Sequence, residues 1–68
     1  MSDRPILPPR ALTALQLSAD GLERSEVAAL MSISRQGVSS ALTTARNKLE
    51  ANTTEHAIAR ALRRGLIT

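Results

Sequence analysis

The 68-residue chain contains no cysteine, phenylalanine, tyrosine or tryptophan. Without cysteine it can form neither a disulfide framework nor a thiolate metal site. Without aromatic rings it lacks the platforms on which single-stranded nucleic acids stack, so a nucleic-acid partner is expected to be a duplex. No apolar run approaches the roughly 20 residues that span a bilayer, and the first ten residues lack a signal-peptide core. We therefore expect a cytoplasmic protein with no membrane partner.

The sequence also lacks a recognisable constellation of catalytic or metal-binding residues. His56 is the only histidine, and one histidine without cysteine cannot supply a metal site. The serines have no nearby base or orienting carboxylate of the kind that activates a nucleophile. We therefore expect no enzyme activity, no catalytic residue, no cofactor, no metal and no small-molecule ligand.

Charge is modest but unevenly distributed. Nine Lys and Arg residues against six Asp and Glu residues give a formal net charge of +3, which permits a phosphate-backbone partner. No acidic residue lies between Glu26 and Glu50. A chain of this length forms one domain at most, with a core that benefits from idealised helices or a partner subunit.

Hydrophobic periodicity predicts an all-α domain of four helices over residues 8–68, preceded by a flexible leader over residues 1–7. The predicted helices span about 9–20, 24–31, 35–49 and a segment that follows the N-cap Thr53 and ends at Gly65. The second helix is expected to bury Val27, Leu30 and Met31. Ser34 is the expected N-cap of the third helix.

The predicted third helix has two different faces. One is an apolar stripe at helical spacing, formed by Val38, Ala41, Leu42, Ala45 and Leu49. The opposite face is polar and almost uncharged: Gln36, Ser40, Thr43 and Asn47, with Ser39 and Thr44 on its flanks. Serine and threonine are poor helix formers, so their use at exposed positions favours a functional cause. Such a helix is suited to enter a DNA major groove.

The second and third predicted helices have the residue pattern of a helix-turn-helix. Ala28 is small where the helices would cross, Val38 is apolar ten residues later, and Ile33 lies in the turn between them. We expect Arg35 and Arg46 to contact phosphates, with Arg10 and Arg24 touching the backbone from the first two helices. The residues expected to contact base edges are Gln36, Ser39, Ser40 and Thr43, and Asn47 is expected to reach a base or a phosphate.

The fourth predicted helix carries more apolar surface than one side of a short terminal helix needs. The residues concerned are Ala57, Ile58, Ala61 and Leu62. We therefore expect a homodimer formed through this helix, with Ala61 as its least buried candidate. Two-fold symmetry would then require an inverted-repeat site in double-stranded DNA.

The chain resembles the LuxR/GerE-type helix-turn-helix family from Leu7 to Ile67, in a register without gaps. The matching residues are Leu7, Pro9, Arg10, Leu15, Gly21, Leu22, Glu26, Val27, Ala28, Ile33, Ser34, Val38, Leu42, Lys48, Leu49, Ala57, Ala59 and the run Ala61–Ile67. The resemblance implies a four-helix transcriptional regulator with its third helix in the major groove, dimerising through its fourth. No receiver or ligand-binding domain precedes the motif, so a stand-alone regulator is expected.

Departures from the family pattern keep a second interpretation open. The family often has Lys or Arg where Ser39 and Thr43 stand, and commonly Gly where Glu50 stands. Without that glycine, Asn52 is expected to take the left-handed position after the third helix. The alternative function is a protein-binding module, an anti-activator or co-regulator that keeps the fold but pairs with another regulator or a polymerase subunit.

Overall fold

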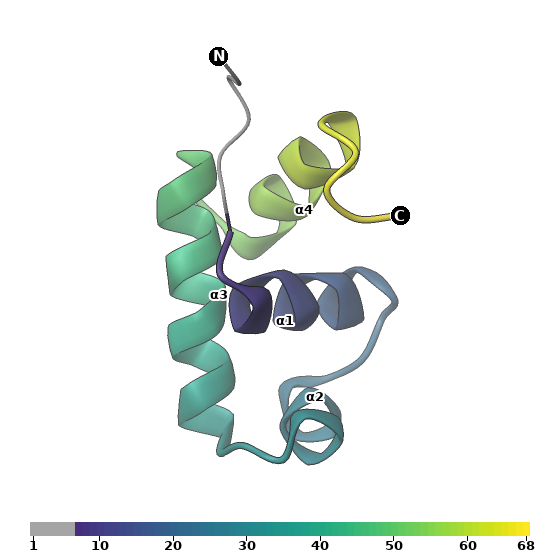
Figure 1. Cartoon of the computed structure of the whole chain (residues 1–68), viewed down its shortest axis with the longest axis vertical. Coiled ribbons are helices and arrows are strands. Elements are labelled where there is room, and N and C mark those ends of the chain that lie inside the picture. The colour runs from purple at the N-terminus through teal and green to yellow at the C-terminus, as the bar shows by residue number, and fades with distance from the viewer. Residues whose placement is uncertain (1–6) are drawn as a thin grey trace.

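The computed structural model describes residues 7–68, which form four α-helices and no strand (Figure 1). The helices are α1 (Pro9–Ala19), α2 (Arg24–Met31), α3 (Arg35–Leu49) and α4 (Thr54–Arg63). The prediction of an all-α chain with four helices is confirmed, and the expected boundaries agree closely. Of the expected leader, residues 1–6 lie outside the described residues. Leu7 is buried and belongs to the core, so the prediction that the flexible leader includes Leu7 is wrong.

The longest helix, α3, organises the molecule. It contacts each of the other three helices. Figure 1 shows α1 crossing α3 near its middle, α2 lying beside the start of α3 and α4 beside its end. Within residues 7–68, no helix has the length and apolar character needed to cross a lipid bilayer.

Local side-chain caps explain where three of the helices begin. The Ser34 hydroxyl accepts a hydrogen bond from the Gly37 amide at 2.9 Å, and the Thr53 hydroxyl accepts one from the His56 amide at 3.0 Å. Both caps are the predicted ones. Glu23 and Glu26 form a capping box at the start of α2, in which the Glu23 amide donates to the Glu26 carboxylate at 2.9 Å. Each cap satisfies amides that the first helical turn leaves unpaired.

The end of α3 differs from the prediction. Glu50 adopts the left-handed conformation at φ 55°, and the Ala51 amide donates to the Arg46 carbonyl at 2.9 Å. This closure requires the left-handed residue to follow the last helical residue directly, so Asn52 stands two positions too late. The same closure ends α2, where Ser32 has φ 57° and the Ile33 amide donates to the Ala28 carbonyl at 3.0 Å.

Alanine forms half of the core. Seven of the fourteen buried hydrophobic residues are alanines, and all five residues of the predicted α3 stripe are buried. The prediction that Leu30 is buried is wrong, because its side chain is 66% exposed. The buried face of α2 is centred between Val27 and Ala28, and Leu30 lies about 110° around the helix from that centre.

Candidate nucleic-acid interface

The outward face of α3 is polar along its length. Gln36, Ser40, Thr43 and Asn47 are all exposed, as their spacing predicts. Ser39 is half-buried on one flank. No acidic residue occurs within α3, so this face carries no charge that would repel an approaching polyanion.

A groove on one flank of this face brings together two arginines from different helices. It encloses about 330 Å³ and is lined by Arg24 of α2 and by Arg35, Gln36 and Ser39 of α3. None of its lining residues is acidic. Both guanidinium groups remain charged at any physiological pH and only donate hydrogen bonds, so the groove suits an anion such as a phosphate group.

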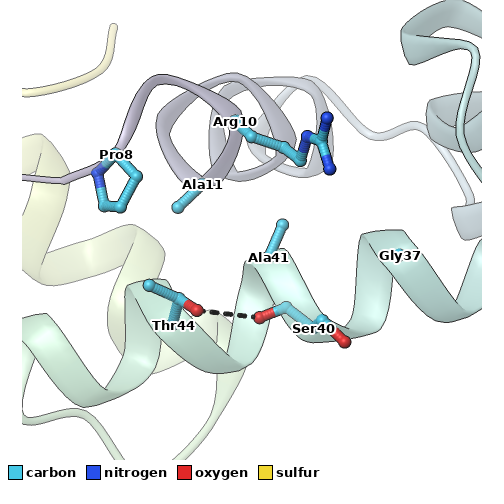
Figure 2. A pocket seen from close by; sticks show the side chains of 7 residues that line it. All are labelled: Pro8, Arg10, Ala11, Gly37, Ser40, Ala41 and Thr44. Atoms are coloured by element: carbon cyan, nitrogen blue, oxygen red, sulfur yellow. Dashed lines mark hydrogen bonds between the residues drawn. The ribbon is translucent and has the colours of Figure 1, made fainter.

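A second groove lies between α1 and α3 (Figure 2). It encloses about 400 Å³, and its lining residues are Pro8, Arg10, Ala11, Gly37, Ser40, Ala41 and Thr44. In Figure 2 the Arg10 side chain runs along α1 above α3, on the side of Ala41 and Gly37. Arg10 is the only charged residue among those lining this groove.

The two grooves border opposite flanks of the polar face. At 100° per residue, Ser39 and Arg35 lie on one side of Gln36 and Thr43, whereas Gly37 and Thr44 lie on the other. Arg24 therefore stands beside one edge of the α3 face and Arg10 beside the other. The sequence predicts that both contact the DNA backbone, but their placement on opposite sides of α3 depends on how α1 and α2 pack, which no local pattern specifies.

Arg46, which the sequence predicts to contact a phosphate, lies beside Thr43. It is half-buried, and its Nη2 donates a hydrogen bond to the Thr43 hydroxyl at 3.2 Å. Its Nε is buried without a hydrogen-bond partner. Arg46 thus lies along α3 toward the polar face, on the same flank as Ser39.

The four residues expected at a dimer interface divide between two faces of α4. Ala57 and Ala61 are fully buried within the single chain, whereas Leu62 is 46% exposed and Ile58 is half-buried. The expectation that Ala61 is the least buried of the four is therefore wrong. The packing of α4 onto the domain buries the small alanines, places Ile58 partly against the core and leaves Leu62 toward solvent.

His56 takes part in local contacts of α4. Its Nε2 accepts a hydrogen bond from Arg60 Nε at 3.0 Å. Among residues 7–68 there is no group of three or more His, Cys, Asp or Glu residues placed to hold a metal ion.

No protein-family model matches the chain, and no curated protein matches its sequence.

Proposed function

We propose that this protein binds double-stranded DNA as a helix-turn-helix transcriptional regulator of the LuxR/GerE type, with α3 in the major groove. The observation that carries the proposal is the outward face of α3, free of acidic residues and bordered by Arg10 and Arg24 in separate grooves. A helix lying in the major groove has a phosphate backbone on each side. An arginine on each side of α3 matches that arrangement.

In this proposal the residues of α3 have separate roles. Arg35 joins Arg24 in contacting phosphates on one strand, and Arg10 contacts the other strand. Such contacts position the protein but carry no sequence information. Gln36, Ser39, Ser40 and Thr43 face the base edges, where hydroxyl and amide groups form hydrogen bonds. Asn47, near the end of the same face, reaches a base or a phosphate.

The proposal includes a homodimer that associates through the exposed side of α4. Ile58 and Leu62 are one helical turn apart and form a short apolar stripe on that side. This interface replaces the four-residue set expected from sequence, since Ala57 and Ala61 are occupied by the core. A two-fold pair would present two copies of α3 to an inverted-repeat site.

A salt titration on duplex DNA tests the proposal. Each phosphate contact contributes about −0.9 to the slope of log affinity against log salt concentration. Arg10→Ala and Arg24→Ala should therefore each flatten the slope by about one unit on any duplex. Arg63→Ala is the matched control, because Arg63 is an exposed arginine of α4 outside both grooves, and it should leave the slope unchanged. The proposal fails if no duplex from a random pool binds at low salt.

A protein-binding module is the second candidate function, and the exposure of Leu30 favours it. Leu30 lies on α2, outside both grooves and outside α4, so neither DNA contact nor the proposed dimer uses it. In this case Leu30→Gln would abolish binding to a regulator or polymerase subunit, while Arg24→Ala would not. Duplex binding that depends on Arg10 and Arg24 would instead favour the first function.

A further inference from the structure

Two neighbouring threonines of α3 use their hydroxyl groups in opposite ways. Thr44 Oγ1 donates its proton to the Ser40 backbone carbonyl at 3.1 Å, as drawn in Figure 2. Thr43 Oγ1 instead accepts a hydrogen bond from Arg46 Nη2 at 3.2 Å. The hydrogen bonds within residues 7–68 leave the Thr43 proton without an acceptor. Thr44 is half-buried, whereas Thr43 is exposed on the polar face.

The contact with Arg46 gives the Thr43 hydroxyl a definite polarity. A hydroxyl group has one proton to donate and two lone pairs that can accept. A guanidinium group can only donate, because it does not lose its proton in proteins. The Thr43 oxygen is therefore engaged as an acceptor by Arg46. Its proton is unused, whereas the neighbouring guanidinium cation repels a second donor from the remaining lone pair and polarises the hydroxyl toward donation.

Arg46 is held in the position that makes this contact. Its side chain is half-buried along α3, and its Nε is buried with no partner. Partial burial along α3 restricts the rotamers open to this side chain, so Nη2 stays within reach of Thr43. In contrast to a freely extended side chain, this guanidinium has a fixed neighbour on the polar face.

We propose that Thr43 recognises a hydrogen-bond acceptor on a base edge, and that Arg46 is the positioning residue that imposes this choice. The inference rests on the proposed function. In the major groove guanine offers acceptors at O6 and N7, thymine at O4 and adenine at N7, whereas cytosine offers only its N4 donor. A Thr43 group that donates its proton therefore disfavours cytosine at the base pair position it contacts.

The test compares single-base variants of the best duplex selected by the wild-type protein from a random pool. The wild type should bind the cytosine variant at one position about tenfold more weakly than the selected base. Thr43→Val has nearly the same shape but no hydroxyl, and it should abolish this discrimination. Thr44→Val is the matched control, because the Thr44 proton is already used by Ser40, and it should preserve the discrimination.

Arg46→Met tests the positioning role. Methionine occupies the half-buried space but carries no charge and no donor, so the Thr43 oxygen regains both lone pairs and can accept from the cytosine N4 group. Discrimination against cytosine should then disappear only at the base pair that Thr43 contacts. Adding Thr43→Val to Arg46→Met should cause no further change in this discrimination. The readout is the ratio of the affinities for the selected duplex and the cytosine variant. The loss of one charge weakens both affinities equally, so it does not change this ratio.

Two outcomes separate this inference from the function on which it rests. If the wild type binds no duplex, both are overturned. If it binds a selected site but Thr43→Val or Arg46→Met keeps the discrimination against cytosine, only the role of Thr43 and Arg46 is overturned. Equal loss of affinity on every duplex for Arg46→Met would likewise show that Arg46 acts through charge alone.

Discussion

The outward faces of α3 and α4 are built on the same plan but have opposite chemistry. Each helix buries small or apolar residues against the domain, α3 with Val38 and Ala45 and α4 with Ala57. The exposed side of α3 carries hydroxyl and amide groups, whereas that of α4 carries Ile58 and Leu62. A polar face suits the hydrogen-bonding edges of a duplex, and an apolar stripe suits another protein surface. The difference suggests that two partners meet the molecule from two directions.

The largest expected effect comes from a substitution on the buried side of α4. Ala61→Arg places a long charged side chain where the native residue is fully buried. We expect a loss of about 3 kcal/mol or more in the free energy of unfolding, because the core must expand around an unpaired charge. In a domain of this size such a loss unfolds most of the protein. Far-UV circular dichroism and urea unfolding measure it, and a fully helical variant would contradict the burial of Ala61.

The second prediction concerns Leu62, the residue after Ala61, which lies on the exposed side of α4. Leu62→Arg should leave the helical content intact, since Leu62 is 46% exposed, but should weaken self-association. Two-fold symmetry introduces the change twice in one interface, so we expect the dimer dissociation constant to rise at least about tenfold.

Sedimentation equilibrium measures this dissociation constant, and Leu30→Arg serves as the matched control. Leu30 is the other exposed leucine and lies on α2, at the opposite end of α3 from α4. If Leu30→Arg dissociates the dimer and Leu62→Arg does not, the interface lies on α2 instead of α4. A wild type that sediments as a monomer, both free and on its DNA site, would exclude the dimer altogether.

The smallest expected effect lies where α3 ends and the chain turns toward α4. Glu50 adopts a left-handed conformation that glycine accommodates without strain. Glu50→Gly should therefore raise the free energy of unfolding by about 0.5–1 kcal/mol. Lys48→Gly, also exposed but inside the helix, should lower it by about 1 kcal/mol. Urea unfolding compares the two, and a loss of stability in both would show that Glu50 makes compensating interactions.

Sequence periodicity predicted α3 correctly because its fifteen residues repeat one apolar stripe over four turns. In α4 the same reasoning could not choose between two adjacent rows. Ala57 and Ala61 form one row with a spacing of four, and Ile58 and Leu62 form another with the same spacing. Hydrophobicity favours burial of the larger pair, yet close helix packing selected the alanines. The incorrect prediction that Leu30 is buried has the same cause: in the eight-residue helix α2, spacing alone could not show which apolar residues face the core.

The site was predictable where it lies on one helix and not where it joins several. The exposed positions of Gln36 and Thr43 follow from helical spacing alone. The approach of Arg10 and Arg24 to α3 depends on the crossing of α1 and α2, which no local pattern specifies. The hydrogen bond from Arg46 to Thr43 joins residues three apart on one helix, a spacing that places side chains in reach. The sequence thus contained that signal, although charge alone suggested a phosphate contact for Arg46.

The length of the polar face limits how much sequence information one copy of the domain can extract. The residues proposed to face base edges run from Gln36 to Thr43, over which the helix rises about 10 Å, or about three base pairs of a duplex. Two copies on an inverted repeat therefore distinguish about six base pairs, or roughly twelve bits, and such a site recurs by chance about once in 4,000 base pairs. If α3 reads duplex DNA as proposed, the protein needs a further source of selectivity, which sequence-dependent bending of the duplex between the half-sites would supply without any additional side chain.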